Sequence, residues 1–566
     1  MPPPSADDRS PENDSSGSAS ADDRSIDDQS ADDRSANDRS DGPDSYSITT
    51  ALVSTGRVLR DRPEAILTAY LLALGTLQVA IAPAFLGLVA ALLSLSAAGR
   101  LGPAIDALPA LADAAGPPGE PAGPTGPGVV GGGEAVPPEA IEALSGLVTP
   151  TSAGAIGLGI LMGFLVWVLA RVITNAITQG TVWAAIDGRA PLVDGLATAG
   201  RWRTFLGLAV LRVGVFLAAL LPAVLVALGA GAFAAFGAGS PTGGGNVLAG
   251  LGAILAALLA LGGALLGVLA QFLLLFAGPA AVVDERGTLG AARASFGFVR
   301  SHFVAAFAFG LVVIGSYVAL SVLAGLLSVA GVAGILAPVL PLVLAPFLDT
   351  AGTALYAGRS VDGADRSPLY ARIGRSLRRG VRELGVFPRE VPLATLLGAL
   401  SLAGAIALGY LLTASYGEVL SPPGDVTGVF GTVPIDTFAT LAVNNWVVSA
   451  RLAFGGVALA VPAIVGLAFN GLLVGGLAGV SDPMTFLALV APHGILELPT
   501  VALAGGIGIH LGHVGWRALR GRADAPAVAD ELKRTGVLLV GIALLLIVAA
   551  FIEAFVTPRV AAAVVG

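Results

Sequence analysis

Apolar residues fill long uninterrupted runs along this chain, and short groups of charged residues separate the runs. Most runs reach roughly 20 residues, the length that a helix needs to cross the hydrocarbon core of a membrane. In the first half they cover residues 65–97, 153–173, 204–236, 247–283, 303–330 and 335–357, and in the second half 392–413, 439–460, 463–480, 486–516 and 536–556. The pattern predicts an all-α polytopic membrane protein with about eleven transmembrane helices in two helical bundles. Asn470-Gly471 and Pro492 could instead mark half-helices, which would change that count by one.

Charged and Pro/Gly-rich segments divide the chain into four predicted parts. These are a tail at 1–50, a six-helix membrane domain at 51–357 with a Pro/Gly-rich external loop at 98–150, a basic cytoplasmic linker at 358–391, and a five-helix membrane domain at 392–566. Basic residues stay on the cytoplasmic side of membrane proteins. We therefore expect a multi-pass protein of the cell membrane with a cytoplasmic N-terminus and an external C-terminus.

Two charged segments have the period of an amphipathic helix. Arg286, Arg293 and Arg300 recur every seven residues, with Leu289, Ala292, Phe296 and Val299 on another face of the same predicted helix. In the linker, Arg372, Arg375, Arg379 and Arg382 occupy one arc of a helix, opposite Leu369, Ile373, Leu377, Val381 and Leu384. These seven arginines are predicted to lie against lipid headgroups. The alternative is that they only mark the cytoplasmic side and bind no particular lipid.

Composition supports the membrane class: 55% of residues are hydrophobic, 12% are charged, and the mean hydropathy is +0.82. The first 44 residues carry thirteen acidic residues and four arginines in repeats close to Ala-Asp-Asp-Arg-Ser, so nearly all of the net charge of −8 belongs to this tail. Having few large apolar residues, the tail is predicted to be disordered. Thirty of the 31 basic residues are arginine, which together with the acidic tail suggests a halophilic archaeon. There is no cysteine, which excludes thiolate chemistry.

Polar side chains interrupt the apolar runs of the second half. A hydrocarbon environment satisfies none of their hydrogen bonds, so we expect them to meet in one interior cluster. The cluster comprises Asn444, Asn445, Asn470, His493, Glu497 and Glu553, with Arg451 as the available counter-charge. Gly471, Gly475 and Gly479 recur every four residues, a spacing that lets helices approach closely. The polar motif could serve packing alone, a binding or transport pathway, or catalysis.

The residues give little support for catalysis or for a cofactor. No serine lies in a nucleophile elbow, and the single lysine, Lys533, does not follow a phosphate-binding glycine pattern. His510 and His513 lie close in sequence to His493, but no metalloprotease motif is present, and we expect no metal site. Nucleic-acid binding is not expected either, because the basic residues are predicted to face the membrane surface.

The second half resembles the stage II sporulation protein M family of integral membrane proteins, over about residues 390–560. The resemblance lies in Asn444-Asn445, Phe454-Gly455, Asn470-Gly471, Pro492-His493-Gly494 with Glu497, Gly505-Gly506, and the segment 551–558. It implies a small helical bundle and a role in envelope remodelling. More loosely, residues 279–300 resemble the membrane domain associated with glycerophosphoryl diester phosphodiesterases, without a catalytic domain.

The sequence therefore favours a non-enzymatic membrane scaffold that acts through membrane lipids or an unidentified envelope protein partner, and a homo-oligomer is compatible with it. The competing hypothesis is a transporter or lipid-handling protein with a mid-membrane polar site at His493 and Glu497. An intramembrane metal enzyme is a third.

Overall fold

The computed structural model describes residues 46–110, 137–237, 244–329, 331–363, 368–417 and 434–565. The predictions for the acidic tail before residue 46 and for the centre of the loop at 98–150 fall outside these residues. Within the described ranges the chain is helical and contains no strand, as an all-α membrane protein requires.

The helices follow the predicted runs closely. The first half contains α1 (Ile48–Asp61), α2 (Pro63–Ala97), α3 (Leu101–Asp106), α5 (Pro138–Ser145), α6 (Pro150–Ile186), α7 (Pro191–Thr198), η1 (Ala199–Arg201), α8 (Trp202–Gly237), α9 (Gly244–Leu273), α10 (Ala277–Val283), α11 (Thr288–Ser301), α12 (Phe303–Val329), η2 (Ala333–Leu336), η3 (Leu340–Leu344) and α13 (Ala345–Ala357). The linker forms α14 (Leu369–Glu390). The second half contains α15 (Pro392–Thr413), η4 (Ala414–Tyr416), α17 (Pro434–Gly455), α18 (Val461–Val480), α19 (Pro483–Leu519), α20 (Ala525–Phe551), η5 (Ile552–Val556) and α21 (Thr557–Val565).

Ten helical segments of the described chain are long and apolar enough to cross a membrane. The eleventh predicted crossing is α17, a helix of 22 residues that falls outside this set. Its polar residues Asn444, Asn445 and Arg451 lower its mean hydropathy, and it packs among α2, α19 and α20. Length and position therefore give α17 the form of a transmembrane helix, although it is less apolar than the others.

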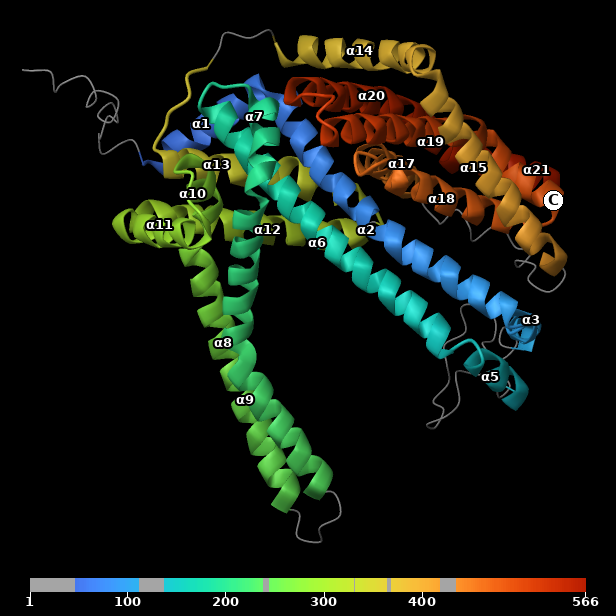
Figure 1. Cartoon of the computed structure of the whole chain (residues 1–566), viewed down its shortest axis with the longest axis horizontal. Helices are drawn as coiled ribbons and strands as arrows, with labels where there is room; N and C mark the ends of the chain where they lie inside the picture. Colours follow the sequence, from blue (N-terminus) through green and yellow to red (C-terminus); the bar gives the residue numbers. More distant parts are fainter. Residues whose placement is uncertain are drawn as a thin grey trace, which may run out of the picture. The chain divides into compact units, whose positions relative to one another are not determined.

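Long helices lie side by side in pairs (Figure 1), and several pairs make close contact at glycines. In the first half, α2 and α6 run side by side, and Gly87 of α2 lies against the backbone of Gly159 of α6. The hairpin of α8 and α9 makes most of its contacts within itself. In the second half, α15 packs along α18, and α20 packs against both α17 and α19.

The two predicted membrane domains share a core. Residues 46–566 form one compact unit, so the linker does not separate two independent bodies. The reason is α2, a first-half helix in which Gly75 allows close approach to Phe454 and Gly455 of α17. Gln78 of α2 also donates a hydrogen bond to the carbonyl of Pro462 in α18, at 3.2 Å.

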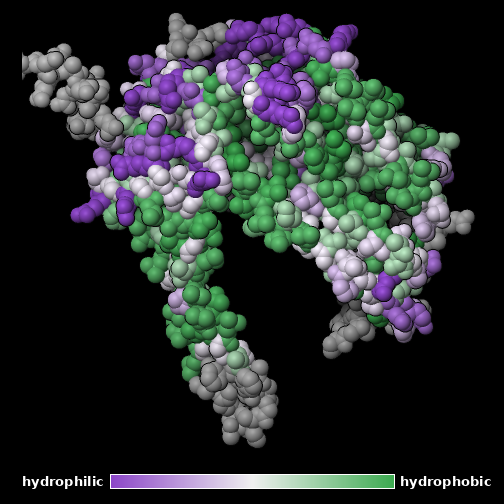
Figure 2. Space-filling model, in the orientation of Figure 1, coloured by the Kyte–Doolittle hydropathy of each residue, from purple (hydrophilic) through white to green (hydrophobic). Residues whose placement is uncertain are grey.

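The surface separates hydrophilic from apolar regions (Figure 2). Hydrophilic residues gather over α14 and around α11, whereas the α8–α9 hairpin is largely apolar. Leu217, Leu258 and Leu265 of that hairpin are all about 60% exposed, at 59%, 62% and 64%. Such exposure would be costly in water, but it is the normal state of side chains that face lipid tails.

Candidate functional site: an embedded His–Glu–Glu cluster

Three side chains from two helical segments meet in the second half. Spacing of four residues places His493 and Glu497 on one face of α19. The segment η5, which follows α20, adds Glu553. His493 Nε2 lies 3.9 Å from Glu553 Oε1, and ligand atoms of all three residues lie within 4.8 Å of one another. We call these three residues the triad.

The triad is shielded but not fully paired. The side chains of His493 and Glu553 are only 13% and 19% exposed. His493 Nδ1 lies 3.4 Å from Thr557 Oγ1, which orients the ring. Glu553 Oε2 is buried and has no hydrogen-bond partner among the described residues. One carboxylate oxygen in an apolar setting therefore lacks the partner that buried polar atoms normally have.

Local sequence explains how the triad is held. Asp482 caps α19 by accepting a hydrogen bond from the backbone N–H of Thr485 at 2.8 Å, and this bond holds the pKa of Asp482 below its ordinary value. Beyond the cap, α19 continues through Pro492 and Pro499 to Leu519. Glu553 lies in η5, which is one π-helical turn. Such turns are rare in proteins as a whole, and those that do occur often lie at functional sites.

The predicted cluster of seven polar residues is only partly formed. Asn444 is exposed and bonds to its neighbour Asn445, while Asn470 donates to the carbonyl of Gly466 in its own helix at 2.7 Å. The asparagine side chains of α17 and α18 find hydrogen-bond partners within their own helices, so they do not need the triad as a partner. These local bonds do not join the asparagines to the triad, and their place in the cluster stays a prediction.

Arg451 was also expected to pair with Glu497 or Glu553, and that prediction was wrong. Phe438 of α17 contacts the rings of Phe551 and Phe555, which places Glu553 level with Phe438. Arg451 is thirteen residues further along α17, about 20 Å at 1.5 Å per residue. Its Nε is buried with no partner within the described part of the chain. Helix register, rather than chemistry, keeps this guanidinium from the carboxylates.

The three glycines of α18 lie where the helix meets α15. A side chain at Gly471 would meet Ala405 and the carbonyl of Leu402, and one at Gly475 or Gly479 would meet the backbone of α15 one and two turns further on. Thr413 of α15 donates a hydrogen bond to the carbonyl of Gly476 at 3.0 Å. The glycine stripe thus lies at a close helix contact.

The seven predicted headgroup arginines are on α11 or on the segments that flank it, and on α14. Arg372 is partly exposed and the other six are exposed: Arg286, Arg293, Arg300, Arg375, Arg379 and Arg382. The apolar residues predicted opposite them are divided between two environments. Val299 of α11 is buried and Leu384 of α14 is partly buried against the core, whereas Leu289, Phe296 and Ile373 are 62%, 49% and 50% exposed.

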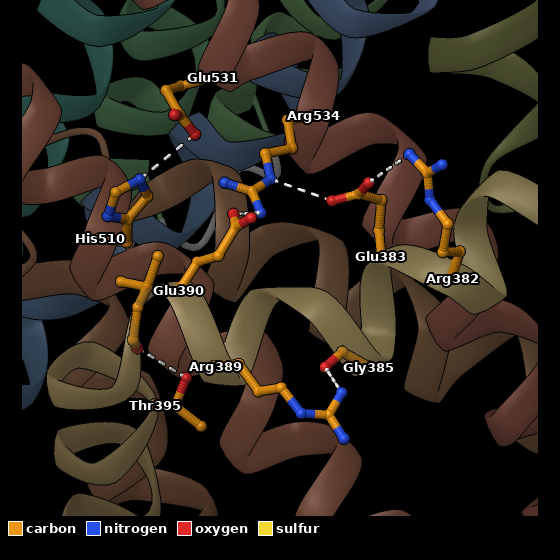
Figure 3. A network of polar contacts seen from close by, with 10 residues as sticks. Arg382, Glu383, Gly385, Arg389, Glu390, Thr395, His510, Glu531 and Arg534 are labelled. Atoms are coloured by element: carbon orange, nitrogen blue, oxygen red, sulfur yellow. Dashed lines mark hydrogen bonds and ion pairs between the residues drawn. The ribbon is translucent and has the colours of Figure 1, made fainter.

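A polar network that the sequence analysis missed ties α14 to the second half (Figure 3). Arg534 of α20 binds Glu383 at 3.2 Å and Glu390 at 2.5 Å, both on α14. Nearby, His510 of α19 contacts Glu531 of α20 at 3.2 Å. His510 and His513 are therefore not joined to His493, because His510 lies more than four turns further along α19. Nothing in the sequence links Arg534 to Glu383 and Glu390, which lie 151 and 144 residues away along the chain.

A second missed feature is a charged group in the first half. The hydroxyl of Tyr70 in α2 donates to Asp349 Oδ2 in α13 at 2.5 Å. Gln179, Arg171 and Arg212 lie close enough to act on this carboxylate. Their spacing in sequence gives no motif, so only the packing of α2, α6, α8 and α13 could reveal them.

The fold and the embedded polar groups define a polytopic α-helical membrane protein. Residues 393–558 match the sequence model of the stage II sporulation protein M family, as the resemblance of the second half predicted. Over 129 residues the chain is 27% identical to an uncharacterized protein of Methanocaldococcus jannaschii, covering 22% of this chain and 72% of that protein. No solved structure matches the chain. The resemblance of the first half to a phosphodiesterase-associated membrane domain stays a prediction.

Proposed function

We propose that the protein is a non-enzymatic membrane scaffold for envelope or membrane remodelling, which acts through lipids and a membrane or envelope protein partner. The match of residues 393–558 to the stage II sporulation protein M family supports this class of role. The observation that carries the proposal is the pair of amphipathic helices, α11 and α14. Each presents exposed arginines beside exposed large apolar side chains, the combination that binds an anionic membrane surface.

The linker helix α14 is the stronger of the two lipid-binding elements. Leu369, Tyr370 and Val381 are 65%, 78% and 55% exposed, so part of its apolar face is not covered by the described protein. Arg379 and Arg382 have exposed side chains, at 59% and 72%. Each such arginine contributes on the order of 1 kcal/mol of attraction to an anionic leaflet. The contacts of α14 with α20 would transmit a lipid-dependent movement to the second half.

The lipid part of the proposal is tested by the lipids retained around the purified full chain. A variant with Arg372, Arg375, Arg379 and Arg382 changed to glutamine should lose anionic lipid relative to the wild type when both are extracted in native nanodiscs. The control changes Arg517, Arg520 and Arg522, which lie in or after the last turn of α19, outside α11 and α14. Equal anionic-lipid content in all three samples would contradict lipid binding by α14.

The partner part of the proposal needs a separate experiment. Crosslinking in native membranes followed by affinity capture should recover a membrane or envelope protein in fixed ratio to the chain, or a second copy of it. A second copy would give the homo-oligomer. Recovery of monomeric chain alone from repeated captures would remove the scaffold proposal.

A second candidate function, lipid handling, is favoured by two neighbouring pockets, one charged and one apolar, lined by residues of α2, α14 and α20. The charged pocket, about 410 Å³, is lined by residues that include Glu64, Arg379 and Arg534. It shares Glu64, Lys533 and Val537 with an adjoining cavity of about 230 Å³, lined mainly by apolar residues such as Leu71, Leu342 and Trp446. A charged pocket beside an apolar cavity has the polarity of a lipid headgroup joined to an acyl chain.

Blocking the apolar cavity distinguishes this candidate from the scaffold. Gly536→Leu would fill it from α20, while the control Ala527→Leu lengthens an exposed side chain in the first turn of the same helix. Under lipid handling, only Gly536→Leu should slow exchange of a fluorescent phospholipid between the leaflets of reconstituted vesicles. No wild-type exchange above that of empty vesicles would reject the candidate. The related hypothesis is that a substrate is transported through the triad. It predicts that Glu497→Gln abolishes the flux of that substrate across the membrane.

A further inference from the structure

We propose that His493, Glu497 and Glu553 bind a divalent transition-metal cation within the membrane-embedded second half. The proposal goes beyond the scaffold function and does not depend on it. The triad offers one imidazole nitrogen and two carboxylate oxygens, from two segments that are 33 or more residues apart in sequence.

The charges of the triad require compensation. Glu497 and Glu553 approach each other in a setting of low polarity, where two like charges cannot both persist without a cation. Among the residues that the structure describes, neither carboxylate has an ion pair with an arginine or lysine. Arg451 is the one basic residue of α17. It lies thirteen residues, about 20 Å along the helix axis, from Phe438, which is level with Glu553. A divalent cation would supply the missing positive charge.

The orientation of the histidine also fits a ligand. Nδ1 faces the hydroxyl of Thr557 at 3.4 Å, and Nε2 faces Glu553. Histidines that bind metals usually direct their second ring nitrogen to a protein oxygen, which fixes the ring and leaves the other nitrogen for the metal. The tautomer that places the proton on Nδ1 would donate to Thr557 and present an unprotonated Nε2 to the cation.

Glu553 provides the third, independent indication. Its Oε2 is buried with no hydrogen-bond partner among the described residues, and the residue lies in the π-helical turn η5. A buried unpaired carboxylate oxygen beside another carboxylate is costly unless a proton or a metal occupies the space between them.

The ligand set indicates the class of cation. Imidazole favours zinc, iron and similar metals, while two carboxylates favour hard cations such as manganese. Zinc accepts nitrogen and oxygen ligands at about 2.0–2.2 Å, and three protein ligands leave one position for water or a partner group. Ligand atoms around such an ion are roughly 3.4 Å apart, so the triad, with its atoms within 4.8 Å, needs only small side-chain adjustments.

The test measures metal on the full chain, purified in detergent with an affinity tag that contains no histidine. After incubation with Zn²⁺ and removal of free metal, we expect about one zinc per chain by mass spectrometry. Co²⁺ should give the visible absorption bands of a four- or five-coordinate site. Glu553→Gln, Glu497→Gln and His493→Gln should each weaken Zn²⁺ binding at least tenfold. His513→Ala is the matched control, because it removes an exposed histidine of the same helix.

Several results would overturn the proposal. Zinc content below one tenth per chain in the wild type would do so, as would equal Zn²⁺ affinity in the wild type and any folded triad variant. Loss of zinc in His513→Ala would place the metal elsewhere. Thermal unfolding separates binding from misfolding: Zn²⁺ should raise the Tm of the wild type and of His513→Ala but not that of the triad variants. If one variant does not fold, the other two still decide.

Discussion

Tyr70 and Asp349 show how one hydrogen bond can join two helices inside the membrane. The phenol of α2 donates to the carboxylate of α13 at 2.5 Å. Removing the donor leaves a buried carboxyl oxygen without its phenol partner in an apolar environment, which costs about 2 kcal/mol. Tyr70→Phe is therefore expected to lower the Tm measured in detergent by intrinsic tryptophan fluorescence. Tyr317→Phe, at an exposed position of α12, should leave the Tm unchanged, and equal Tm values for the two variants would contradict this role.

Gly475 is the residue at which helix packing and helix propensity oppose each other most directly. Replacing glycine by alanine inside a helix normally favours the helix by roughly 1 kcal/mol. At Gly475, however, a Cβ would overlap the carbonyl of Ile406, and backbone cannot yield as a side chain can. Overpacking of this kind costs about 1–3 kcal/mol, so the clash should win.

The glycine prediction has a control in the partner helix. Gly404 of α15 has no atom within 4 Å of the position that a Cβ would take. We expect Gly475→Ala to lower the Tm and Gly404→Ala to keep or raise it. A Tm for Gly475→Ala at or above that of the wild type would mean that α15 and α18 do not approach as closely as the structure places them.

At the level of elements, α14 is held by two kinds of contact. Gly380 lets the helix lie against the backbone of Gly541, and Arg534 bridges Glu383 and Glu390. Arg534 is only 22% exposed, and the side chain of Glu383 is 16% exposed, so this pair is better shielded from water than most surface ion pairs. Neutralising Arg534 would leave both glutamates without their shared cation.

Arg534→Gln should therefore loosen α14 while the rest of the protein stays folded. Hydrogen–deuterium exchange of residues 369–390 is expected to rise, with little change in α15 or α19. The neighbouring Lys533→Gln is the control, since Lys533 pairs with Asp530 of its own helix at 3.2 Å. Equal exchange in α14 for both variants would show that the glycine contact alone holds the helix.

Elements were the part of this fold that the sequence predicted best. Uninterrupted apolar runs and flanking arginines located the long helices, because a membrane helix needs little beyond length and apolarity. Contacts between helices were harder to predict from the sequence. The requirement that embedded polar groups meet led to the correct expectation that Glu553 would join His493 and Glu497, but the chain alone could not show that register would exclude Arg451. The partners Tyr70 and Asp349, 279 residues apart, carry no local signal at all.

At the scale of the whole molecule, the shared core changes what the two halves can do. Gly75 of α2 against Gly455 of α17 joins them near the centre of the protein, and the buried cluster that includes Leu72, Leu452 and Leu467 contains side chains from both. Motion of one half as a rigid body against the other would therefore break a packed interface. This arrangement favours a scaffold, or a site opened by local movement of α14, over two bundles that rock about the linker.

The number of crossings decides where the chain ends should lie. Ten apolar helical segments and α17 make eleven helices that could cross, and if all eleven do, we predict that the two ends of residues 46–565 lie on opposite sides. Exposed arginines cluster at α11 and α14, so these helices should face the cytoplasm. The absence of any native cysteine makes the arrangement testable with single substitutions.

Glu285 precedes α11 and Glu139 lies in α5, and both are exposed. In intact cells, a membrane-impermeant maleimide should label Glu139→Cys and not Glu285→Cys, and permeabilised cells should show labelling of both. Labelling of Glu285→Cys alone in intact cells would invert the topology and place the arginines of α11 and α14 outside. Labelling of both variants in intact cells would mean that α6, α8 and α9, which separate the two positions, do not all cross the membrane. Either of these two results would contradict lipid binding by α14 at the cytoplasmic leaflet.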